Sequence, residues 1–154
     1  MTQALTGTLH TAMLAVACAM SGSAAAASAD DWAKAEPLIK AALECKSKLK
    51  YTPEVNAVLA AAKDQYGTYN LPGEITLFGL KTKSINLYEG DEEDGRSYTA
   101  IFLTNSLPEV GKAAKLTKEK GGMRWLKLRK DGSLMFEAGA PREGQAHLNC
   151  LMPF

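Results

Sequence analysis

The sequence predicts an α+β domain: two N-terminal helices packed on an antiparallel sheet of about five to six strands, with one short inserted helix. Three observations lead to this fold class. Apolar residues recur at helical spacing in the N-terminal third, and from Leu71 onward they alternate with polar residues. An Asp-Gly pair then separates two of the alternating runs, which is the strongest hairpin signal in the chain.

Composition excludes several classes of protein. The 154 residues are 46% apolar and 23% charged with a net charge of +1, as in ordinary globular domains rather than disordered or fibrous chains. This balance gives no overall reason to bind DNA or RNA. No apolar run reaches the roughly 18 residues of a membrane span, so we expect neither a nucleic-acid partner nor an integral membrane protein.

The first 27 residues resemble a secretory signal peptide. They contain no Lys, Arg, Asp or Glu, their apolar core is short, and Ala25 and Ala27 form an A-x-A cleavage motif. We therefore expect a signal peptide over 1–27, a single domain over 28–154 and a periplasmic or secreted location. Cleavage after Ala29 is a second choice. Cys18 resembles a lipoprotein processing site, which is a less favoured route to the same compartment.

Two helices are expected before residue 67. Asp30 or Asp31 can cap a helix beginning at Trp32, and Pro37 either kinks that helix or restarts it before the apolar stripe of 38–49. Thr52 followed by Pro53 is typical of a cap and a first-turn proline, and apolar residues then recur at helical spacing as far as Gly67.

The remaining elements are short. Ser106 and Glu109 have capping-box spacing and predict the inserted helix, which ends before Gly121-Gly122. The strands are expected where β-branched and aromatic residues alternate with polar ones, over residues 75–78, 84–89, 98–103, 123–130, 133–138 and 145–152.

Two cysteines remain after export, and they are predicted to form a disulfide. Cys45 lies on the apolar stripe of the first helical region, and Cys150 alternates with apolar residues on one face of the last strand, so both point at the same core. An oxidising compartment favours their pairing. The rival interpretation is a redox-active or metal-binding pair, but no Cys-x-x-Cys spacing or nearby histidine cluster supports it.

Two charged segments are candidate partner-binding surfaces. The run from Glu89 to Gly95 includes Asp91, Glu92, Glu93 and Asp94, whose consecutive acids do not fit a calcium loop. The run is a solvated hairpin tip, a docking loop for a basic surface or, as the least favoured alternative, a cation-binding segment. The stretch from 112 to 130 holds eight basic residues against Glu119. Alternation there predicts that Trp125, Lys127 and Arg129 share one solvent-facing side, which suits an acidic protein, an anionic envelope polymer or simple solvation.

No catalytic set is recognisable, so we do not expect an enzyme, a metal or a cofactor. His147 should point away from Cys150 together with Asn149, and Ser97 lacks the glycine pattern of a nucleophile elbow. The expected function is a small exported, non-catalytic binding protein with a protein partner in the cell envelope, such as an inhibitor or immunity protein against an envelope-targeting enzyme. The alternative is a structural or chaperone-like envelope assembly factor.

Overall fold

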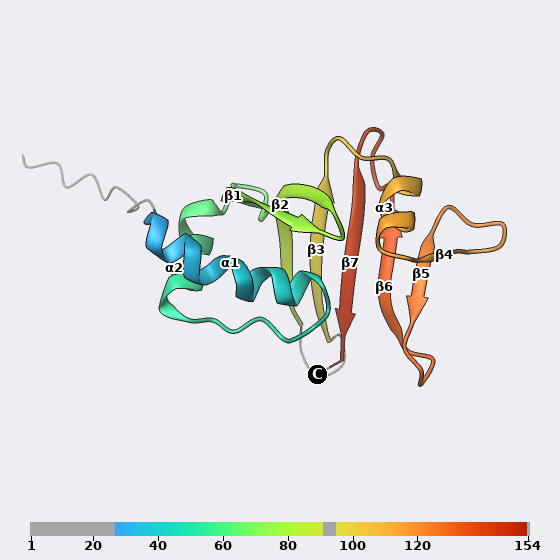
Figure 1. Ribbon diagram of the computed structural model, residues 1–154, viewed down its shortest axis with the longest axis horizontal. Coiled ribbons are helices and arrows are strands. Elements are labelled where there is room, and N and C mark those ends of the chain that lie inside the picture. Colours follow the sequence, from blue (N-terminus) through green and yellow to red (C-terminus); the bar gives the residue numbers. More distant parts are fainter. Residues whose placement is uncertain (1–26, 91–94, 154) are drawn as a thin grey trace, which may run out of the picture.

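The computed structural model describes residues 27–90 and 95–153, and its secondary structure is that of an α+β domain (Figure 1). Seven strands form one sheet in the order β1-β2-β3-β7-β6-β5-β4, and every neighbouring pair is antiparallel. The fold class is confirmed, and the sheet has slightly more strands than expected. The elements are α1 (Ala29–Leu43), α2 (Pro53–Ala62), β1 (Tyr69–Leu77), β2 (Leu80–Glu89), β3 (Arg96–Phe102), α3 (Leu107–Ala113), β4 (Thr117–Lys118), β5 (Trp125–Leu128), β6 (Leu134–Gly139) and β7 (Ala146–Met152).

Helix α1 begins and ends on defined caps. Ser28 is the N-cap, and its hydroxyl and backbone N–H both pair with Asp31 in a capping box. The helix runs without a break through Pro37 but stops at Leu43, earlier than the predicted 49. It stops because Cys45 adopts a left-handed conformation with φ 54°, and the N–H of Lys46 donates to the carbonyl of Ala41 in a Schellman arrangement.

Helix α2 has the predicted start and an earlier end. The hydroxyl of Thr52 accepts a hydrogen bond from the N–H of Val55, and Pro53 occupies the first turn. The helix ends at Ala62, so Tyr66 lies in a turn rather than on a helical face. The inserted helix α3 begins with the predicted Ser106–Glu109 capping box and ends at Ala113, well before the two glycines.

Strands β1, β2 and β3 begin earlier than predicted, β5 is shorter than predicted at both ends, and β6 and β7 each begin one residue later than predicted. The hairpin around Asp131-Gly132 is confirmed, with Arg129 N–H donating to Ser133 across the turn. Strand β4, which was not anticipated, adds two residues at the edge beside β5. Strand β1 forms the other edge and carries an irregularity between Asn70 and Ile75.

One face of the sheet holds the core. Tyr98, Phe102 and Phe136 are nearly inaccessible to solvent and lie on this face with the helices above them. Cys45 at the end of α1 is bonded to Cys150 of β7, with Cα atoms 5.5 Å apart, and α3 packs against β6 and β7 on the same side. The predicted disulfide is therefore present in the structure, and such a bond is compatible with an oxidising, exported location.

No helix in the described residues is both long enough and apolar enough to cross a membrane.

Candidate functional site

The opposite face of the sheet is polar and is covered by no helix among the described residues. Ladder pairing places Ser84, Ile101 and His147 side by side across β2, β3 and β7. The next row contains Asn86, Thr99, Asn149 and Glu137, which pair in turn across four strands. We call this surface the open face. Its polar rows follow from strand alternation, because the intervening residues point into the core.

Several side chains of the open face are held by one another. The hydroxyl of Ser84 donates to Oδ1 of Asn70 at 2.9 Å, and the hydroxyl of Thr99 donates to Oδ1 of Asn149. Toward β5, Nε of Arg124 lies 3.2 Å from a carboxylate oxygen of Glu137. These pairs give the face a fixed pattern of donors and acceptors.

A hollow of about 520 Å³ lies over the row of Ser84, Ile101 and His147. The turn after α2 borders it on one side, and the β6–β7 loop borders it on the other. The residues that line it are Asp64, Tyr66, Thr68, Ser84, Asn86, Ile101, Leu103, Pro141, Arg142, Gln145 and His147.

The turn after α2 holds Tyr66 at the rim of this hollow. One carboxylate oxygen of Asp64 accepts hydrogen bonds from the N–H groups of Tyr66 and Thr68, both at 2.8 Å, and Gly67 takes the left-handed conformation that closes the turn. The ring of Tyr66 is 83% exposed. A large aromatic side chain is thus presented to solvent by a turn whose backbone is hydrogen-bonded.

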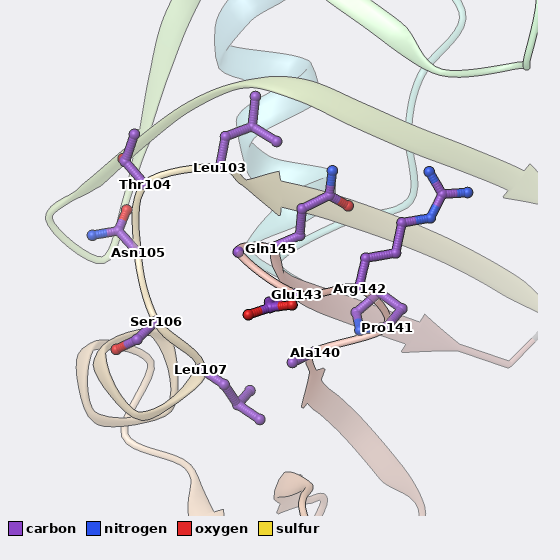
Figure 2. Close-up of a pocket in the computed structure, with 11 residues that line it drawn as sticks. Leu103, Thr104, Asn105, Ser106, Leu107, Ala140, Pro141, Arg142, Glu143 and Gln145 are labelled. Carbon is purple, nitrogen blue, oxygen red and sulfur yellow. The ribbon is translucent and has the colours of Figure 1, made fainter.

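The β6–β7 loop supplies the opposite border. Gln145 N–H donates to the carbonyl of Arg142, and Gly144 adopts a positive φ within this turn. A second hollow of about 540 Å³ lies between this loop and the β3–α3 loop, and it shares Leu103, Pro141, Arg142 and Gln145 with the first (Figure 2). In Figure 2 the side chains of Arg142 and Gln145 project to the same side of the loop. Leu103 is 58% exposed between the two hollows.

His147 lies between the first hollow and a smaller one of about 300 Å³ that reaches Met123 and Asn149. Its Nε2 is buried and has no hydrogen-bond partner in the described structure. Burial lowers the pKa of His147, and the positive charge of Arg142 lowers it further. The imidazole is therefore neutral near pH 7, as expected for a partly buried ring.

Acid–base or metal chemistry needs a second group within reach of this histidine. Within residues 27–90 and 95–153, no three His, Cys, Asp or Glu side chains gather in a way that could hold a metal ion. The charged side chain that shifts the pKa of His147 is Arg142, whose guanidinium is a cation rather than a base.

The structure corrects the orientation predicted for Trp125. The expected solvent-facing tryptophan is half-buried against the core, because α3 packs over β5 and places Gly111 directly on the indole. Lys127 pairs with the core residue Phe136 in the ladder, so it lies on the helix side of the sheet and not on the open face. It is exposed there, and Arg129 is half-buried in the following turn.

The other predicted docking segment cannot be placed. Asp91, Glu92, Glu93 and Asp94 lie outside the described residues. Of the predicted site residues that the structure describes, it brings Cys45 and Cys150 together.

The residues that border the hollows were missed by the sequence analysis. The predicted orientation of His147 and Asn149 away from Cys150 is confirmed, and the same alternation applied to Ser84, Asn86 and Thr99 would have indicated the polar floor. Tyr66, Leu103 and Arg142 belong to separate turns and loops, and no local pattern shows that these converge.

The chain matches no protein family model, and neither a curated protein nor a solved structure is significantly similar to it. A functional interpretation must therefore come from the geometry of the open face itself.

Proposed function

We propose that this chain is a small exported, non-catalytic binding protein that engages a protein partner in the cell envelope through its open face. The observation that carries the proposal is the hollow over His147, which combines a polar floor with exposed Tyr66 and Leu103 at its rim. Protein interfaces are enriched in aromatic and Met anchors that surround or fill such pockets. Met123, which is 86% exposed, borders the neighbouring hollow in the same way.

The state of His147 favours binding over catalysis. Its pKa is lowered and its Nε2 is buried, so a molecule in either hollow would not contact that nitrogen without movement of the ring. Exposed and half-buried donors and acceptors on the open face, among them Asn86, Thr99 and Asn149, can instead hydrogen-bond to a partner.

The partner that best fits an exported, disulfide-bonded chain is an enzyme directed at the cell envelope. In that role the protein would act as an inhibitor or an immunity protein, with Tyr66 and Leu103 as apolar anchors. Truncation of an anchor at the centre of an interface costs roughly 2 kcal/mol or more, which is about a thirtyfold loss of affinity.

The experiment that tests this proposal is capture of partners from periplasmic extract on the immobilised protein, with mass spectrometry of what is retained. Variants Tyr66→Ala and Leu103→Ser remove the proposed anchors. Leu128→Ser is the matched control, because Leu128 is 56% exposed, close to the 58% of Leu103, but lies away from the hollows.

The expected result is one stoichiometric soluble enzyme that wild type and Leu128→Ser retain and that both anchor variants lose. Recovery of only membrane-assembly subunits would instead support the structural or chaperone-like alternative. Equal loss in Leu128→Ser would show that the open face is not the binding surface. Charge reversal at Asp91, Glu92, Glu93 and Asp94 tests the acidic segment separately, since unchanged affinity removes it from the interface.

A further inference from the structure

Positive charge is concentrated in one part of the chain. Residues 107–139 hold eight Lys and Arg against four Asp and Glu, a net charge of +4, whereas the whole chain has +1. This segment forms α3, β4, β5 and β6, which lie at the end of the sheet remote from α1 and α2 (Figure 1). A protein whose total charge is nearly zero therefore has one strongly basic end.

Most of these cations are not neutralised by neighbours. Arg124 pairs with Glu137, but six lysines form no ion pair with any described residue: Lys112, Lys115, Lys118, Lys120, Lys127 and Lys130. All six are exposed. Two more of the four acids are engaged, because Glu109 caps α3 and Asp131 holds Ser133 in the hairpin turn.

The basic end also exposes two large apolar side chains. Met123 is 86% exposed in the loop between β4 and β5, and Leu128 is 56% exposed at the end of β5. The loop is a closed turn, since Glu119 N–H donates to the carbonyl of Arg124 at 3.0 Å, so Lys120 and Met123 sit together at its tip. Apolar side chains that project among lysines are typical of segments that rest in a membrane interface.

We propose that the β4–β5 end of this protein binds the surface of an anionic phospholipid bilayer. Its lysines would meet the phosphate head groups, and Met123 would enter the boundary between head groups and acyl chains. A soluble polyanion would use the lysines alone and gain nothing from Met123, which is why the bilayer is the favoured ligand. Met123 also borders the small hollow beside His147, but the six lysines line none of the hollows described above, so this proposal does not depend on the identity of the protein partner.

The test is co-sedimentation of the protein from residue 28 onward with vesicles, because the apolar leader would bind lipid by itself. Vesicles of phosphatidylcholine are compared with vesicles that also contain phosphatidylglycerol. Each lysine near an anionic surface contributes about fivefold to binding, so Lys118→Gln/Lys120→Gln should weaken binding about 25-fold. Met123→Ser should weaken it by about tenfold through lost apolar burial.

The matched control is Lys48→Gln/Lys50→Gln, which removes the same charge from two exposed lysines between α1 and α2 that form no ion pair with a described residue. Binding that requires phosphatidylglycerol, survives in the control and weakens in both test variants supports the proposal. Equal binding to both kinds of vesicle would overturn it, and so would equal weakening in the control. Full binding by Met123→Ser together with displacement by soluble polyphosphate would identify a polyanion site instead.

Discussion

A Cβ atom on Gly111 would lie 2.6 Å from Cε3 of Trp125, so the backbone of α3 rests directly on the indole ring. This contact joins the inserted helix to an outer strand that has only the two residues of β4 on its far side. It also explains why Trp125 is half-buried and not available as a solvent-facing ligand. Glycine is required here for space, since its φ is not positive.

Replacement of Gly111 by alanine should destabilise the protein although alanine favours helices. The added methyl group must displace Trp125, and overpacking of this kind costs about 1–3 kcal/mol. Gly139→Ala is the matched control, because a Cβ there meets nothing within 4 Å. Denaturant unfolding should show a lower midpoint for Gly111→Ala only. A midpoint unchanged from wild type would mean that the indole is not held against α3.

The phenol of Tyr98 connects the loop after α1 to the sheet. It accepts a hydrogen bond from Leu49 N–H at 3.2 Å and donates to a carboxylate oxygen of Glu89 at 3.0 Å. Tyr98→Phe should leave that buried N–H without a partner and lower the free energy of unfolding by about 1–3 kcal/mol.

Tyr51→Phe is the control for this prediction. Tyr51 donates to the same oxygen of Glu89 at 3.0 Å, but it is 47% exposed, so water replaces the lost bond. Tyr51→Phe should lower the free energy of unfolding by less than about 1 kcal/mol in the same measurement. Equal effects of the two substitutions would show that the Leu49 bond does not stabilise the fold.

The Cys45–Cys150 bond closes a segment of 105 residues, so it restricts the unfolded chain strongly. The double variant Cys45→Ala/Cys150→Ala should lose about 2–5 kcal/mol of stability. Reductant should lower the stability of wild type by a similar amount and leave the variant unchanged. Thiol counting on the unfolded protein from residue 28, without reductant, should find no free cysteine; two would refute the bond.

The lowered pKa of His147 makes stability depend on pH. The native imidazole binds its proton more weakly than the unfolded one, whose pKa is about 6.5, so the unfolded state takes up more protons as pH falls. The contribution of His147 is therefore complete at pH 8 and decreases below about pH 6.5. We expect the stability difference between wild type and His147→Gln to shift in favour of the variant from pH 8 to pH 5.

The protein from residue 28 contains only this histidine. The difference in free energy of unfolding between wild type and His147→Gln therefore separates the effect of His147 from that of the carboxylates. Parallel pH profiles for the two proteins would show that His147 has the same proton affinity in the native and unfolded states.

Local chemistry made parts of the fold predictable. The caps at Thr52 and Ser106 and the turn at Asp131-Gly132 involve hydrogen bonds between residues a few positions apart, so their patterns can be read from the chain. The end of α1 was less predictable. A non-glycine residue in the left-handed conformation, here Cys45, carries no sequence signal, and its bonding partner Cys150 lies 105 residues further along the chain.

The sequence by itself determined the α+β class, the separation of charges and the two faces of each strand, because these depend on spacing along one segment. Tertiary structure alone decided which side of β5 is covered and which loops meet over His147. Alternation shows that Trp125 and Leu126 face opposite sides, but only the packing of α3 decides which side is buried. Likewise, Tyr66 and Arg142 border one hollow only when β2, β3 and β7 align beneath them, which no local pattern can specify.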